Sequence, residues 1–385
     1  MSVLRIVPSA ILSTALAGCA ARADRIETTD TVPTPESGAP AIMPASHAAP
    51  QPPARENPPA PASSIQLQDF AETIAKERGI PLKHAQQLLS EASFNSRIAQ
   101  LMAPSKTKAA KKSWAAYRKR FVEPIRIRQG LAFWQRKQET LDSVSTQYGI
   151  PASILVSIIG VETLYGQHMG NFRVLDALYT LGFHFPDSKR PERAAFFREQ
   201  LADLIQLDHE GRLDARRTQG SYAGALGIPQ FMPGSLMRYA ADGDNDGKID
   251  LLGNEDDAIA SVASFLRKHD WQPGLPVFAP VRLPADPAPL VHGGLKPSLQ
   301  WSQLQDKGAS LGETTGSLSW QAHPLGVIDL PEESQGTADY RTATPNFFAI
   351  TEYNRSYFYA TAVTDLAEEL AARMGYGSPN YSAID

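Results

Sequence analysis

The segment from Ile154 to Gly166 holds a single carboxyl group, that of Glu162, in an otherwise mostly apolar stretch. Pro151 stands where a helix can begin and Gly166 where it can end, so the segment predicts a helix. Glu162 lies close to its C-terminal end, where apolar neighbours and the negative end of the helix dipole both raise the pKa of a carboxyl group. A rise of about two units from a reference near ~4.3 would leave a general acid usable near neutral pH. The alternative is a glutamate that is exposed or paired at the end of its helix.

Apolar residues recur at helical spacing over most of the chain from Leu67 to His269, and again near its end. The expected helices are Leu67–Arg78, Pro81–Leu101, a stretch from about 108 to 148 divided by Pro124 and Gly130, Val174–Gly182, Pro191–His209, Glu255–His269 with Asn254 as its cap, and Arg355–Met374 with Asn354 as its cap.

The composition changes between Pro273 and Pro345, a region with ten prolines. Short runs there, such as Val277–Ala279 and Gly326–Leu330, are typical of strands. The expected fold class is therefore mainly α, an α+β chain with a helical body and a small β insertion. The length of 385 residues allows two or three domains.

The N-terminus predicts an export signal and a tether. Residues 1–18 have one early arginine and an apolar run too short to span a bilayer, as in a secretory signal peptide. Leu16-Ala17-Gly18-Cys19 resembles a bacterial lipobox, in which Cys19 is lipidated; the alternative is a signal with an incidental cysteine. Residues 19–64 contain ten prolines and no aromatic residue, so we expect a disordered linker. Ala20 after the cysteine favours the outer membrane, by resemblance to enterobacterial lipoproteins.

Composition excludes several classes of protein. A formal net charge of -4 argues against a dedicated nucleic-acid binder. The basic run from Lys106 to Arg120 is interleaved with Trp114 and Tyr117, and we interpret it as a solvated helix face with an aromatic pair behind it. Cys19 is the only cysteine, which excludes a disulfide framework and a cysteine zinc site. The histidines form no H-E-x-x-H pair, and no Ser-His-Asp arrangement is supported.

Residues 220–233, Gly-Ser-Tyr-Ala-Gly-Ala-Leu-Gly-Ile-Pro-Gln-Phe-Met-Pro, are rich in small residues. Small residues allow a close approach of the backbone, while Ser221, Tyr222 and Gln230 offer neutral hydrogen-bonding groups. Such groups suit the hydroxyl and acetamide groups of a sugar. A tight crossing between helices explains the segment equally well.

Residues 242–250, Asp-Gly-Asp-Asn-Asp-Gly-Lys-Ile-Asp, match an EF-hand loop. The expected ligands for calcium or another hard cation are Asp242, Asp244, Asp246, the backbone carbonyl of Lys248, and Asp250. Position 12 is Gly253 instead of glutamate, so Asn254 or Glu255 is expected to complete the shell. The alternative is an Asp-rich turn that caps the next helix.

These motifs, in this order, closely resemble the lytic murein transglycosylase B family. The likeness runs from about Phe70 to the last helix, and it is carried by residues 158–163, 173–178, 220–233, the Asp-rich loop, 117–121 and 345–347. It implies a lysozyme-like helical core with an N-terminal helical domain and a small antiparallel β domain. The implied domains are 65–130, rejoined by the helix 354–376, then the core 131–272, and the β domain 273–353.

The resemblance also implies an activity, cleavage of the β-1,4 bond between N-acetylmuramic acid and N-acetylglucosamine in peptidoglycan. Glu162 would be the single acid/base, and attack by the muramic C6 hydroxyl would leave a 1,6-anhydro product. One carboxyl group suffices because the substrate supplies the nucleophile, unlike in most glycosidases. The positions that match the family's glycan cleft are Tyr117, Arg193, Ser221, Gln230, Asn346 and Tyr353. Glu192 stands where the family has a second arginine.

The implied partners are peptidoglycan strands and, through the lipid, the periplasmic face of the outer membrane; no organic cofactor and no nucleic acid are expected. A lysozyme-like hydrolase is the nearest alternative enzyme. A catalytically silent peptidoglycan-binding lipoprotein would keep the cleft but would not need a protonated Glu162. A calcium sensor is a third alternative, and it predicts a large change of shape when the cation binds.

Overall fold

The computed structural model describes residues 63–104, 111–313, 316–376 and 378–379. The expected signal peptide, Cys19, most of the linker, Lys106 and Lys108 lie outside these ranges. The helices are α1 Ser64–Arg78, α2 Leu82–Glu91, α3 Ser96–Met102, α4 Trp114–Phe121, α5 Pro124–Arg136, α6 Gln138–Tyr148, α7 Ala152–Thr163, α8 Val174–Phe183, α9 Pro191–His209, α10 Pro233–Tyr239, α11 Glu255–Lys268, α12 Trp301–Asp306, α13 Pro345–Tyr353 and α14 Tyr357–Met374.

The strands form three small antiparallel pairs. These are β1 (Phe172–Arg173) with β2 (Gln219–Gly220), β3 (Val281–Arg282) with β4 (Ser310–Leu311), and β5 (Gly326–Glu332) with β6 (Thr337–Ala343). In the longest pair Gly326 lies opposite Ala343 and Glu332 opposite Thr337. The mainly helical fold class with small antiparallel sheets is confirmed.

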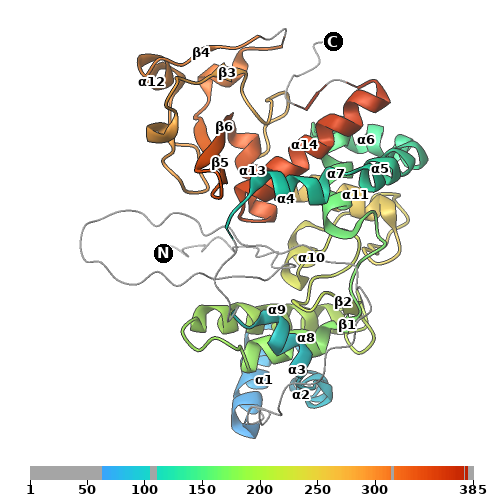
Figure 1. The fold of residues 1–385 in the computed structure, drawn as a ribbon. Helices are drawn as coiled ribbons and strands as arrows, with labels where there is room; N and C mark the ends of the chain where they lie inside the picture. Colours follow the sequence, from blue (N-terminus) through green and yellow to red (C-terminus); the bar gives the residue numbers. More distant parts are fainter. Residues whose placement is uncertain (1–62, 105–110, 314–315, 377, 380–385) are drawn as a thin grey trace, which may run out of the picture.

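The elements gather into two helical lobes and a β region (Figure 1). In the lower lobe, α1, α2 and α3 lie with α8 and α9, whereas in the upper lobe α14 lies across α4, α5 and α7. The expected domain 65–130 is thus spread over both lobes, and its boundary falls inside α5. Its division from the core stays a prediction, because these contacts by themselves do not define domains.

Three sequence-predicted helix boundaries were wrong. Gly130 does not divide a helix, because it lies inside α5 where a Cβ atom would come within 2.3 Å of the Tyr165 hydroxyl; the break falls at Lys137 instead. Asn354 ends α13, and the Ser356 side chain caps α14 by accepting from the backbone N–H of Tyr359. The stretch 81–101 forms two helices, α2 and α3. The cap of α11 at Asn254 is confirmed.

The β region also differs in part from its prediction. The run Gly326–Leu330 is a strand as expected, but Val277–Ala279 contributes only one bridge, between Phe278 and Ala343. Two helices, α12 and α13, lie within 273–353 as well. A separate apolar cluster around Trp320 and Leu304 gives this region its own core.

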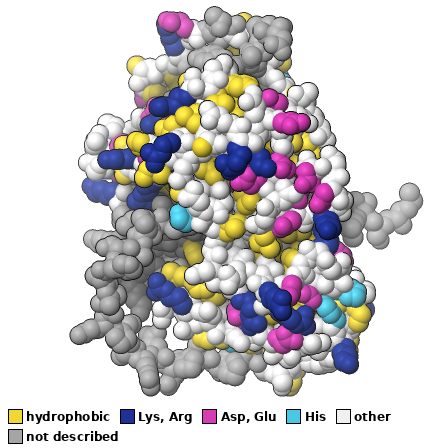
Figure 2. Space-filling view, turned by 90° about the vertical axis from the view of Figure 1, so that its right-hand side faces the viewer, with side chains coloured by type: hydrophobic (Ala, Val, Ile, Leu, Met, Phe, Trp, Pro, Cys, Tyr) yellow, Lys and Arg dark blue, Asp and Glu magenta, His cyan; other side chains and the backbone are white. Residues whose placement is uncertain are grey.

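The main core is built around α7, all of whose residues are buried. None of the described helices is by itself long and apolar enough to cross a membrane; α6 and α7 pass that test only together, with a bend of 114° between them. On α4, Trp114 and Tyr117 are buried while Lys119 and Arg120 are exposed, as expected for a solvated basic face. Acidic and basic side chains are interspersed over most of the face in Figure 2.

Candidate active site

Glu162 lies in the last turn of α7 and is only 8% exposed. Burial raises the pKa of its carboxyl group to about 7, and a hydrogen bond from Tyr359 acts in the opposite direction. The Tyr359 hydroxyl, on α14, donates to Oε1 of Glu162 at 2.6 Å. Among the described residues no arginine, lysine or histidine forms an ion pair with Glu162. The carboxyl group can therefore keep a proton near neutral pH.

Three buried tyrosines from three helices surround this carboxyl group. They are Tyr117 on α4, Tyr353 on α13 and Tyr359 on α14, and the nearby charge of Glu162 helps to raise the pKa of each. The rings of Tyr353 and Tyr359 are stacked, with centroids 6.5 Å apart and planes 11° apart. Tyr353 donates its hydroxyl to the carbonyl of Pro229 at 2.6 Å. The Tyr117 hydroxyl is buried and has no hydrogen-bond partner among the described residues.

The end of α7 is joined to the glycine-rich segment 220–233 by side chains. Thr163 donates its hydroxyl to the carbonyl of Ile228 at 2.8 Å and accepts from the backbone N–H of Gly166 at 2.9 Å. The Gln230 amide donates to the carbonyls of Gly227 and Met169, at 2.9 and 3.2 Å. These bonds fix the glycine-rich segment beside the residue that follows Glu162.

Close packing accounts for part of the small-residue composition. A Cβ atom on Gly170 would lie 2.2 Å from the carbonyl oxygen of Gly220, so only glycine fits. Ser221 is nearly buried, and its hydroxyl accepts from the backbone N–H of Ala225 at 3.0 Å. The close approach thus joins a loop residue, Gly170, to strand β2 and not two helices, and the interpretation of the segment as a sugar site stays a prediction.

Asn346 and Arg193 lie apart from this group. The Asn346 side chain is fully buried and bonds only backbone: it accepts from the N–H of Gln272 at 2.7 Å and donates to the carbonyls of Gln272 and Leu275 at 2.9 and 2.7 Å. Arg193, on α9, stacks over Phe185 and Phe197. Burial, with the nearby charge of Arg190, lowers its pKa to about 10.

The Arg193 guanidinium is unusual for a buried cation. Its Nε has no hydrogen-bond partner among the described residues, and no described acidic side chain forms an ion pair with it. Tyr222, next to Ser221, is close enough to influence its pKa. Arg193 therefore lies near the glycine-rich segment, whereas the Asn346 side chain is enclosed within the protein.

Sequence reasoning missed Tyr359. It lies 197 residues from Glu162, on a helix whose apolar spacing was recognised, but nothing in that spacing says which polar side chain meets the carboxyl group. Two tyrosines, Tyr357 and Tyr359, in the first turn of this amphipathic helix were the available signal.

The Asp-rich loop brings together three carboxylates, two from the expected ligand set, Asp242 and Asp244, and one from outside it, Asp257. Oxygens of Asp242, Asp244 and Asp257 lie within 4.8 Å of one another. Asp257 is buried in the first turn of α11 and accepts from the N–H groups of Gly243 and Asp250, at 2.7 and 2.6 Å. Burial raises its pKa, with the charges of its two partners adding to the effect.

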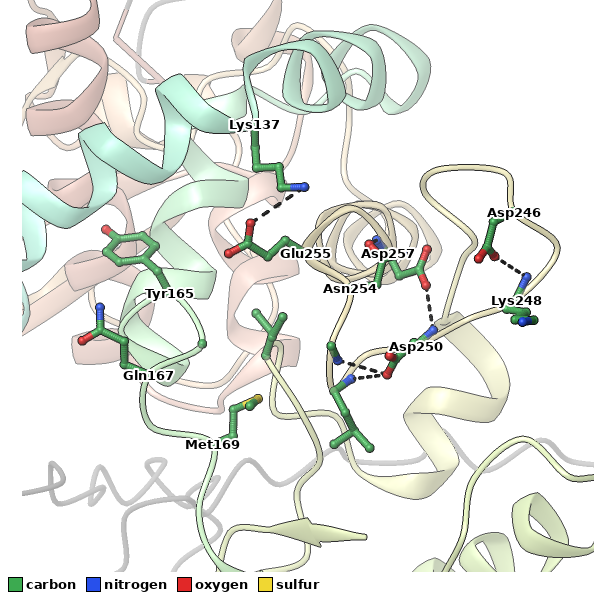
Figure 3. Close-up of a pocket in the computed structure, with 14 residues that line it drawn as sticks. Lys137, Tyr165, Gln167, Met169, Asp246, Lys248, Asp250, Asn254, Glu255 and Asp257 are labelled. Atoms are coloured by element: carbon green, nitrogen blue, oxygen red, sulfur yellow. Dashed lines mark hydrogen bonds and ion pairs between the residues drawn. The ribbon is translucent and has the colours of Figure 1, made fainter.

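That Asn254 or Glu255 completes the shell stays a prediction. The Asn254 side chain caps α11 and donates to Asp244 at 2.8 Å, and Glu255 pairs with Arg136 at 2.7 Å. Asp246 and Asp250 accept from backbone N–H groups within the loop, as Figure 3 shows in part.

The three-carboxylate group fits a hard cation. Oδ1 of Asp242 is buried and has no hydrogen-bond partner among the described residues, and the Asp242 carboxylate lies close to two like charges. Carboxylate oxygens are the ligands that calcium prefers. A bound divalent cation would offset the mutual repulsion of the three groups.

The loop is coupled to the glycine-rich segment through backbone. The N–H of Ile228 donates to the carbonyl of Leu251 at 2.8 Å. Gly227 has a φ of +65°, and a Cβ atom there would lie 2.1 Å from the Leu251 oxygen. A cavity of about 560 Å³ lies between the loop and the segment 165–169, and Glu162 does not line it (Figure 3).

The chain matches a known domain family and is similar to a characterised protein. The family described as the transglycosylase SLT domain matches residues 63–368. The membrane-bound lytic murein transglycosylase B of Escherichia coli (strain K12) is 33% identical over 317 residues, which cover 80% of this chain and 84% of that protein.

Solved structures share the fold. The soluble lytic transglycosylase SltB1 from Pseudomonas aeruginosa aligns with a TM-score of 0.71 at 35% identity, over 80% of this chain and 99% of that chain. The Escherichia coli lytic transglycosylase Slt35, solved in complex with calcium, aligns with a TM-score of 0.68 at 33% identity, over 80% of this chain and 93% of that chain. The lysozyme-like transglycosylase fold expected from the resemblance is confirmed.

Proposed function

The chain belongs to the transglycosylase SLT family and is a lytic murein transglycosylase, and we propose that Glu162 is its single catalytic acid and base. The observation that carries this proposal is the buried carboxyl group with a pKa of about 7 and no countercharge among the described residues. Such a group is protonated often enough to act as an acid and is basic enough, once ionised, to take a proton back.

In the first step, Glu162 gives its proton to the glycosidic oxygen while the bond from that oxygen to C1 of the N-acetylmuramic acid breaks. In the second step, the carboxylate takes the proton of the C6 hydroxyl of the same sugar as its oxygen bonds to C1. The products are a free 4-hydroxyl on N-acetylglucosamine and a 1,6-anhydro ring, and no water is consumed. Glu162 ends in its starting protonation state.

We assign glycan contacts to the polar groups that the fold leaves beside Glu162. The Tyr117 hydroxyl, which has no hydrogen-bond partner among the described residues, is suited to a sugar oxygen. Ser221 and Gln230 would add polar contacts from the glycine-rich segment. Tyr353 supports the cleft through its stack with Tyr359. Arg193 would take an acidic group of the substrate, since a buried guanidinium without an ion pair favours an anion. For Asn346 the three backbone bonds support a role in holding the segment 272–275.

Asp242, Asp244 and Asp257 would hold a structural calcium ion, as the calcium complex of Slt35 supports. The name of the membrane-bound relative supports an anchor at Cys19 and a site on the periplasmic face of the outer membrane. Incorporation of labelled palmitate into the full chain, and its loss in Cys19→Ser, tests the anchor.

Digestion of peptidoglycan sacculi followed by mass spectrometry tests the reaction. A transglycosylase releases products lighter by one water than those of a hydrolase, the nearest alternative. Glu162→Gln should lower turnover by about 10²–10⁴-fold, since general acid–base catalysis contributes that much, and it should still bind glycan. Glu77→Gln, an exposed change on α1, is the matched control and should keep wild-type turnover. Hydrated products, or full turnover in Glu162→Gln, would contradict the proposal.

A further inference from the structure

We propose that Tyr359 is a positioning residue that holds one oxygen of Glu162, Oε1, and so leaves Oε2 to exchange the proton with the substrate. This inference rests on the proposed role of Glu162 as acid and base. It concerns a residue that the sequence patterns did not single out.

The hydrogen bond itself carries the first step of the argument. The Tyr359 hydroxyl has one hydrogen, and at 2.6 Å that hydrogen is directed at Oε1. No other described group hydrogen-bonds the carboxyl group. When Glu162 is neutral, its own proton therefore belongs on Oε2, because Oε1 already accepts from Tyr359. When Glu162 is ionised, Tyr359 stabilises the negative charge on Oε1.

The surroundings keep the Tyr359 ring in place. Its side chain is 2% exposed, and its backbone N–H is held at the start of α14 by the Ser356 hydroxyl at 3.3 Å. The stacked Tyr353 ring covers one of its faces, and Tyr353 is in turn fixed by its bond to the Pro229 carbonyl. A ring that is held on its helix and against its neighbour can set the orientation of a carboxyl group.

The other titratable groups near Glu162 do not take this role. Tyr117, from α4, has no hydrogen-bond partner among the described residues, and the Tyr353 hydroxyl, from α13, is used elsewhere. Arg126, from α5, donates to the carbonyl of Gly160 at 2.9 Å and forms its ion pair with Glu123. From α6 and α11, which also pack on α7, no charged group shifts the pKa of Glu162.

The pH dependence of turnover separates positioning from a merely structural role. Turnover must fall as pH rises through the pKa of Glu162, because the first step needs the proton. The Tyr359 bond favours the carboxylate, so its removal raises that pKa. In Tyr359→Phe the pH range over which turnover falls, called the falling limb below, should move to higher pH by about one unit. A hydrogen bond to a charged group usually shifts a pKa by about this much. Turnover at the optimum should fall as well, because Oε1 and Oε2 become interchangeable.

The experiment compares release of 1,6-anhydro products from sacculi across pH for the wild type, Tyr359→Phe and Tyr165→Phe. Tyr165 is the matched control, a buried tyrosine that donates to the Arg126 carbonyl at 3.1 Å and does not contact Glu162 through a hydrogen bond; its limb should stay in place. Replacement of Tyr359 by 3-fluorotyrosine, a nearly isosteric and stronger donor, should move the limb to lower pH and keeps the test open if Tyr359→Phe folds poorly.

A limb that stays in place in both Tyr359 variants would overturn the inference, whatever happens to the rate. The proposed function is judged separately by Glu162→Gln. If that variant is inactive while the limb does not move, Glu162 remains the acid and base and only the role of Tyr359 is wrong. If it retains turnover, the proposed function itself fails.

Discussion

The carboxyl group of Glu162 and those of the Asp-rich loop show two ways to place acidic side chains in one protein. Glu162 is buried and accepts a hydrogen bond from Tyr359 on α14, and burial raises its pKa to about 7. Asp244 in the loop is exposed, and a hydrogen bond from Asn254 leads the effects that lower its pKa. The environment of Glu162 holds a proton for chemistry, whereas that of Asp244 favours the charged form that can bind a cation.

The largest expected effect is on the free energy of unfolding and comes from Glu162. Its folded-state pKa of about 7 lies above the reference of 4.5, so between these values the folded protein keeps a proton that the unfolded chain has released. Stability therefore falls as pH rises through this window, by about 3 kcal/mol in all. Glu162→Gln should be more stable than the wild type by up to ~3 kcal/mol at about pH 8 and equal to it at about pH 4.

Urea unfolding at both pH values measures this difference, with Glu77→Gln as the exposed control. A gain of the same size at both pH values would show that the glutamine packs better and that the proton is not involved.

A smaller effect on stability is expected at the Asp-rich loop. Asp257→Ala leaves the N–H groups of Gly243 and Asp250 without their acceptor, which should cost about 1–3 kcal/mol. It should also abolish the rise in melting temperature that calcium gives the wild type. Thermal unfolding with calcium and with a chelator tests both points.

Asp246→Asn is the control for the loop, because Asp246 is exposed and lies outside the three-carboxylate group. It should keep most of the rise that calcium causes. If instead Asp246→Asn abolishes that rise and Asp257→Ala retains it, the ligand set expected from the EF-hand pattern is the correct one.

The smallest effect concerns the link between the two regions. Thr163→Val removes the bonds to the Ile228 carbonyl and the Gly166 N–H, and should cost about 1 kcal/mol. Turnover should also fall, since Thr163 adjoins Glu162. Thr73→Val, which removes an exposed bond to the Asp69 carbonyl within α1, should change stability by less than ~0.5 kcal/mol and leave turnover intact. Equal effects from the two variants would argue against the link.

The sequence predicted what local spacing determines. The apolar surroundings of Glu162, the Asp-rich loop and the cap at Asn254 all depend on neighbours within a few residues. Asp257 was missed because it reaches the loop from the next helix, beyond the twelve-residue pattern. Tyr359 was missed because α14 must first pack on α7. Gly130 was taken for a helix break because the sequence does not show that the Tyr165 hydroxyl packs against this position. Only a residue without a side chain leaves room for that hydroxyl.

The central claim is that Glu162 keeps its proton near neutral pH, and direct titration tests it. The side-chain carboxyl carbons of the glutamates, labelled with ¹³C, can be followed by NMR, and the signal of Glu162 is assigned by its loss in Glu162→Gln. We expect a pKa of about 7 for this signal in the free enzyme. A value at or below the reference of 4.5 would contradict the account, because the group would then be ionised where it has to act as an acid.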